Sequence, residues 1–110
     1  MDFDAFYIEL EEQLQALIKK RFNIHRKAAQ ADVAEYLRLS KGRLQDYIRL
    51  LEVKKITPEE HDFLVQALKQ NALLFTMKES GRNVMALKRF AEAMVTVTIE
   101  VALTFAIKAI

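Results

Sequence analysis

The sequence predicts a mainly α-helical protein, a compact bundle of about five helices that forms a single domain over residues 1–110. The 110 residues are 52% hydrophobic and 29% charged, and only two glycines and one proline are present to break helices. Over most of the chain the apolar side chains recur every three or four residues, which is the spacing of one helical face. A segment near the C-terminus has a period of two instead, and it leaves room for one β-strand.

The first half of the chain contains three predicted helices. The first, from residue 3 to residue 22, is the most regular. Two shorter helices, over about residues 26–37 and 40–53, follow it and are separated by too few residues for anything but a tight turn. The apolar face of the first helix consists of Phe3, Phe6, Tyr7, Leu10, Leu14, Leu17, Ile18 and Phe22.

A fourth helix is predicted to begin after Thr57. The threonine hydroxyl can cap the free backbone amides, Pro58 suits the first helical position, and Glu60 completes a capping box. The run from Ser80 to Asn83 is typical of a turn, and we expect a further helix to start after it.

The segment from Val95 to Ile107 alternates apolar residues with threonine, alanine and charged residues. Together with its β-branched residues this favours a strand, and a continued apolar helix is the alternative. A strand must find a partner. That partner is either a second copy, which would make residues 84–110 an oligomerisation segment and the protein a homodimer, or the short run Leu73 to Met77.

Charge is unevenly distributed although the formal net charge is only +2. The first 18 residues hold five acidic and no basic side chains, whereas residues 19–55 hold eleven Lys and Arg against four acids. A positive field of this kind favours a polyanionic partner.

Residues 30–49 read QADVAEYLRLSKGRLQDYIR. This segment resembles the helix-turn-helix of the phage repressor and Cro-like (Xre-type) DNA-binding family. Ala34 matches the small residue at the crossing of the two helices. The sequence departs from the family at Arg38, where a turn glycine is usual. The matching apolar positions are Val33, Leu37, Leu39, Leu44 and Tyr47.

The resemblance implies sequence-specific binding of double-stranded DNA by a homodimer, and therefore a transcriptional regulator, most simply a repressor that occupies its operator. In this hypothesis the outward side chains of the recognition helix read the bases, and other polar side chains hold the phosphates. The predicted base-reading residues are Lys41, Arg43, Gln45, Asp46 and Arg49, and the predicted phosphate contacts are Gln30, Ser40, Arg26 and Lys27.

The alternative function is that of a non-enzymatic helical assembly or adaptor protein that oligomerises through its apolar C-terminal segment. Exposure of Arg43, Gln45 and Arg49 distinguishes the two hypotheses, because the DNA-binding one needs these side chains free.

Enzyme, metal and cofactor functions are not expected. The chain has no cysteine, and His25 and His61 lie far apart without carboxylates at metal-ligand spacing. No residue pattern suggests a catalytic group or a small-molecule substrate. The acidic start of the chain is unlike a secretion signal, and charges interrupt the apolar C-terminal stretch, so we expect a cytoplasmic protein that does not use a membrane.

Overall fold

The structure is a computed structural model, and it describes residues 2–72 and 74–108. Within these ranges the chain forms five α-helices and no β-strand, which confirms the prediction of a mainly α-helical bundle. The helices are α1 (Phe3–Arg21), α2 (Arg26–Glu52), α3 (Pro58–Gln66), α4 (Phe75–Glu79) and α5 (Val84–Lys108), with short 3₁₀ helices at Asn23–His25 and Ala67–Asn71.

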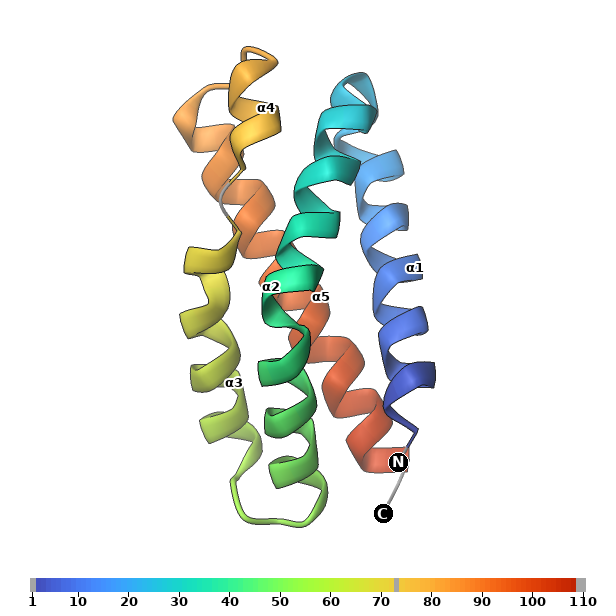
Figure 1. Ribbon diagram of the computed structural model, residues 1–110. Coiled ribbons are helices and arrows are strands. Elements are labelled where there is room, and N and C mark those ends of the chain that lie inside the picture. The colour runs from blue at the N-terminus through green and yellow to red at the C-terminus, as the bar shows by residue number, and fades with distance from the viewer. Residues whose placement is uncertain (1, 73, 109–110) are drawn as a thin grey trace.

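Four of the helices, α1, α2, α3 and α5, form an antiparallel bundle (Figure 1). α1 packs against α2 and α5, and α3 packs against the same two helices from the other side. Because consecutive helices run in opposite directions, every second connection lies at the same end of the bundle. The end of α1, the start of α2, the short α4 and the start of α5 therefore all meet at the upper end in Figure 1.

Local sequence explains where α1 and α3 begin. The Asp2 carboxylate accepts hydrogen bonds from the backbone N–H groups of Asp4 and Ala5 at 3.0 and 3.2 Å. Thr57 and Glu60 form the predicted capping box, with reciprocal bonds of 3.0 and 3.1 Å, and Pro58 takes the first helical position. These starts agree with the sequence prediction.

The predicted turn of a helix-turn-helix is absent, because α2 continues through it from Arg26 to Glu52. Arg38, at the position where the family has glycine, favours helix and bonds the Glu35 carboxylate three residues earlier, with Nε at 3.1 Å. A left-handed turn without glycine would cost about 1 kcal/mol. The uninterrupted helix avoids that cost and keeps its backbone hydrogen bonds, so residues 30–49 lie in one continuous helix instead of two crossed helices.

A glycine substitution distinguishes the continuous helix from a turn. In an exposed helical position Arg38→Gly should destabilise the protein by about 1 kcal/mol relative to Arg38→Ala, which removes the same ion pair. At a left-handed turn position the order would be reversed, and the glycine variant would be the more stable. Urea unfolding of both variants, followed by circular dichroism, measures the difference.

The strand prediction for Val95 to Ile107 is wrong as far as the chain is described, because α5 is helical throughout this segment. Its buried side chains recur at helical spacing, and α5 packs against all the other helices, so its apolar residues find partners within their own chain. The buried members of α5 include Phe90, Met94, Val95, Thr98, Ile99, Val101, Ala102 and Ala106.

The alternative strand pairing is also not seen, since residues 75–79 form α4. Leu73 lies outside the described residues, as do residues 109–110 and the side chain of Ile107.

A buried hydrogen bond joins α2 to α5. The Thr98 hydroxyl donates its single proton to the carbonyl oxygen of Met94 at 2.8 Å. The Tyr36 hydroxyl, 2.9 Å from Thr98 Oγ1, must therefore be the donor in the bond between the two side chains. Burial raises the pKa of Tyr36, which keeps its phenol protonated and able to donate.

The carboxylate of Asp32 holds α4 in place. It is 4% exposed and accepts hydrogen bonds from the backbone N–H groups of Thr76 at 3.2 Å and Met77 at 2.9 Å. These amides belong to the first turn of α4, where no intrahelical acceptor exists. A side chain from α2 thus caps a helix that lies 44 residues further along the chain.

Removing this cap should loosen α4. We expect Asp32→Ala to lower the free energy of unfolding by about 1 to 3 kcal/mol, because two amides lose a charged acceptor. Asp46→Ala, an exposed aspartate on the same helix, is the matched control and should change stability little. Equal effects of the two substitutions in urea unfolding would contradict the assignment of Asp32 as a cap.

Candidate nucleic-acid interface

The five predicted base-reading residues do not form one surface. Lys41, Arg43, Asp46 and Arg49 are exposed, and Gln45 is half-buried. On a continuous helix the side chains of Lys41 and Arg43 project roughly 200° apart. The Lys41 ammonium lies 4.8 Å from the centre of the Tyr7 ring on α1, so it leans toward that helix.

One of the predicted phosphate contacts is wrong. Ser40 is fully buried, and its hydroxyl oxygen accepts from the Asn71 side-chain amide at 3.3 Å, so it cannot reach a phosphate. Gln30 is half-buried and donates to the side-chain oxygen of Gln15 on α1 at 3.1 Å, and its contact with phosphate stays a prediction. Arg26 and Lys27 are exposed at the start of α2, as predicted.

A different set of cations comes together where α1 ends, α2 and α5 begin, and α4 lies (Figure 1). We call this surface the basic end. Apart from the buried Asp32, its only acidic side chains among the described residues are Glu79 and Glu92. Its cations are Lys19, Lys20, Arg21, Arg26, Lys27, Lys78, Arg82, Lys88 and Arg89.

The helix dipoles explain the positions of only some of these cations. Cations in the last turn of α1 are favoured by the negative end of its dipole. Arg26 and Lys27, by contrast, lie in the first turn of α2, which has no acid, and the first turn of α5 also has none. Cations at helix N-termini are unfavourable for the helix itself. Their presence there is therefore not explained by the stability of α2.

Aromatic packing holds the basic end together. The rings of Phe22, at the end of α1, and Phe90, on α5, lie 4.4 Å apart between centroids. The Arg82 guanidinium lies 5.7 Å from the Phe22 ring, and its buried Nε has no hydrogen-bond acceptor in the described part of the chain. The loop before α5 is thus fixed against the end of α1.

Exposed apolar side chains lie at the same end. Ile24, in the short connection between α1 and α2, is 88% exposed, and Val84 and Met85 at the start of α5 are 72% and 61% exposed. Each has a Lys or Arg within three residues in the sequence. The basic end therefore presents aliphatic tips among its cations.

The opposite end of the bundle is mainly acidic. The bundle is 43 Å long, so the acidic end and the basic end are well separated along its axis. The connection from α2 to α3, at the acidic end, also carries two cations, Lys54 and Lys55. The acidic side chains there are Asp2, Asp4, Glu52, Glu59, Glu60 and Asp62.

His61 lies near this acidic end, on α3, and is 1% exposed. Burial lowers the pKa of its imidazole, and attraction to the Asp62 carboxylate, 3.9 Å away, opposes this without reversing it. No cluster of three or more His, Cys, Asp or Glu side chains that would suit a metal occurs among the described residues. His61 is thus a neutral packing side chain at pH 7.

The lowered pKa predicts a pH-dependent stability. Above pH 6.5 His61 is neutral in both states. As the pH falls below this value the unfolded chain binds a proton first, so stability decreases toward the lower folded-state pKa. The free energy of unfolding should therefore fall more between pH 7.5 and 5.5 in the wild type than in His61→Gln. Parallel pH profiles for the two proteins in urea unfolding would contradict the prediction.

Sequence analysis missed Lys78, Arg82, Lys88 and Arg89 as parts of the interface. The charge excess was traced only as far as residue 55, and these four follow it. The alternation of helix direction was the available signal, because it places the connection before α5 beside the one between α1 and α2.

Comparison with known proteins places the chain in no family: no family model, no curated protein and no solved structure matches it. Among the helices of the described residues, none is both long enough and apolar enough to span a membrane.

Proposed function

We propose that the protein binds double-stranded DNA through the basic end, by contacts to the phosphates. The observation that carries this proposal is the gathering of nine Lys and Arg side chains with only two accessible acids, including cations at the start of α2 where the helix itself favours carboxylates. Phosphate groups are the ligands that such a surface attracts most strongly.

The size of the surface suits a duplex. The bundle is 22 by 19 Å across its shorter dimensions. Duplex DNA carries one charge per ~1.7 Å of its axis, so a footprint of about 20 Å faces roughly a dozen phosphate charges. Several cations can therefore be neutralised at once, and each contact should release a counterion into solution.

DNA is thus still the proposed partner, but the proposed contacts are those of the basic end with phosphates and not those of a recognition helix with bases. Contacts to phosphates position a protein without reading sequence. Recognition of an operator by the outer face of α2, through Arg43 and Arg49, and action as a repressor are a second step that phosphate binding would support. The exposed positions of these two arginines are compatible with that step.

The binding of a fluorescent duplex, followed by anisotropy over a salt series, tests the basic end. Reversing Arg26 and Lys27 to Glu should weaken binding at least tenfold at low salt and reduce the salt slope by about 2, because two phosphate contacts are lost. The control, Lys54→Glu with Lys55→Glu, changes the net charge equally at the opposite end and should weaken binding far less.

Three outcomes would count against the proposal or extend it. Equal losses in the two double variants would reduce the effect to net charge and overturn the basic end as the site. Tighter binding to vesicles containing phosphatidylserine than to duplex, lost in Ile24→Ser, would replace DNA by a lipid surface. Enrichment of one duplex sequence from a random pool, lost when Arg43 and Arg49 are reversed, would extend the proposal to base reading.

A further inference from the structure

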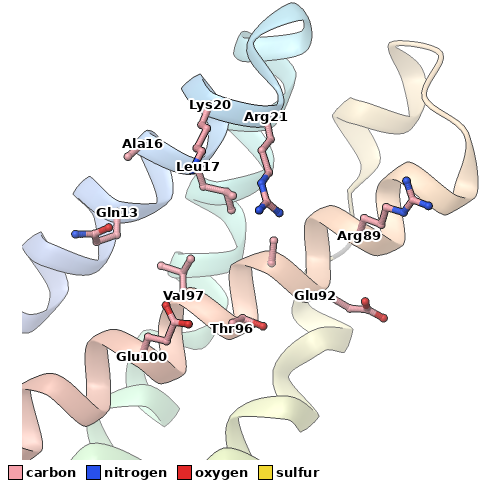
Figure 2. A pocket seen from close by; sticks show the side chains of 11 residues that line it. Gln13, Ala16, Leu17, Lys20, Arg21, Arg89, Glu92, Thr96, Val97 and Glu100 are labelled. Carbon is pink, nitrogen blue, oxygen red and sulfur yellow. The ribbon is translucent and has the colours of Figure 1, made fainter.

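A groove runs between α1 and α5 along one side of the bundle, and Figure 2 shows its larger part. It consists of two adjoining hollows of about 580 and 380 Å³, which share Gln13, Val97 and Glu100. Leu17 and Val97 contribute apolar surface to it. Its lining includes Lys20, Arg21 and Arg89 of the basic end but neither Arg26 nor Lys27.

The charged side chains of this groove are ordered along its length. Lys20, Arg21 and Arg89 lie toward the basic end, and Glu100 lies toward the other (Figure 2). Glu9 lines the adjoining hollow together with Glu100. Glu92 is the exception, an acid in the basic part. Within residues 2–72 and 74–108, Arg89 and Glu100 form no ion pair. Apart from Glu92, the face is thus positive at one end and negative at the other, and among the described residues Arg89 and Glu100 have no ion-pair partner.

Arg89 and Glu100 cannot pair with each other inside one chain. They lie eleven residues apart on α5, which is three helical turns, so they share a face but are separated by about 16 Å. Halfway between them are Ala93 and Thr96, whose small side chains also line the groove. A second helix can approach closely at this point.

We propose that a second copy of the chain covers this groove, with the two α5 helices antiparallel about a two-fold axis near Ala93 and Thr96. In that register each Arg89 faces Glu100 of the second copy, and the contact occurs twice because a two-fold interface is self-complementary. Each Ala93 meets Thr96 of the second copy at the centre. The uncompensated charges of one copy are then the partners of the other.

The position and charges of α1 are compatible with the same two-fold axis. Its Phe22 and Phe6 rings contact Phe90 and Phe105 of α5, so the two helices are antiparallel at a constant register and residues 16–17 lie level with the proposed axis. The rotation brings the basic last turn of α1 onto the acidic middle of α1 in the second copy, around Glu12. Two helices therefore support one axis independently.

The two kinds of contact have different roles. Exposed ion pairs add little affinity and mainly select the register and orientation of an interface. Covering Leu17 and Val97 in both copies supplies the favourable free energy. The proposed dimer thus uses the side of α5 that carries Arg89, Ala93, Thr96 and Glu100. Most of the apolar residues of α5, which the sequence predicted to oligomerise, are instead buried in the core of the bundle.

Sedimentation velocity over a concentration series tests this interface with the full chain. Arg89→Glu and Glu100→Arg each place like charges opposite each other twice, and each should raise the dissociation constant of the dimer at least tenfold. The double swap restores both pairs and should restore the dimer. An equimolar mixture of the two single variants should form a heterodimer, because one copy then carries two acids and the other two bases.

The control is Arg43→Glu on α2, which lies away from the groove and should leave the dimer unchanged. A wild-type chain that stays monomeric up to ~1 mM would overturn the proposal. So would a dimer that both single variants leave intact, since it must use another surface. Circular dichroism of every variant verifies that the helices are retained.

Discussion

The burial of α5 among all the other helices is the constraint on which the rest of the structure depends. This last helix contributes Phe90 and Met94 to the interior with no exposed surface, and it contacts α1, α2, α3 and α4. The Tyr36–Thr98 hydrogen bond fixes the position of α5 along the axis of α2, because a shift of α5 by one helical turn would break the bond between these two buried hydroxyl groups. Once α5 is fixed, the positions of the two ends of the bundle follow.

Features set by neighbouring residues were predictable from the sequence, and features set by distant ones were not. The starts of α1 and α3 follow from caps within three residues, and the face of α1 follows from its period. The turn at Arg38 was mispredicted because a long helix with one buried face has apolar residues at many of the same positions as a helix-turn-helix. The strand at Val95 was mispredicted because tertiary packing overrides the β-propensity of threonine and valine.

The candidate site shows the same division. Arg26 and Lys27 are exposed, as a phosphate contact requires, whereas Ser40 and Gln30 bond to Asn71 and Gln15, which are distant in sequence and could not be foreseen from a local pattern. The basic end is assembled from four separate segments, so no window of the sequence contains it. Arg26 and Lys27 oppose the dipole of α2, and this conflict between helix stability and position separates the basic end from an ordinary solvated surface.

The cap on α4 also orders the folding of the chain. A helix of five residues is far below the length at which an isolated helix persists in water. Its first-turn acceptor is the Asp32 carboxylate on α2, so α4 gains that hydrogen bonding only after α2 has formed and the chain between them has returned to the same end. The stability of α4 therefore depends on tertiary contacts with α2 rather than on its own sequence.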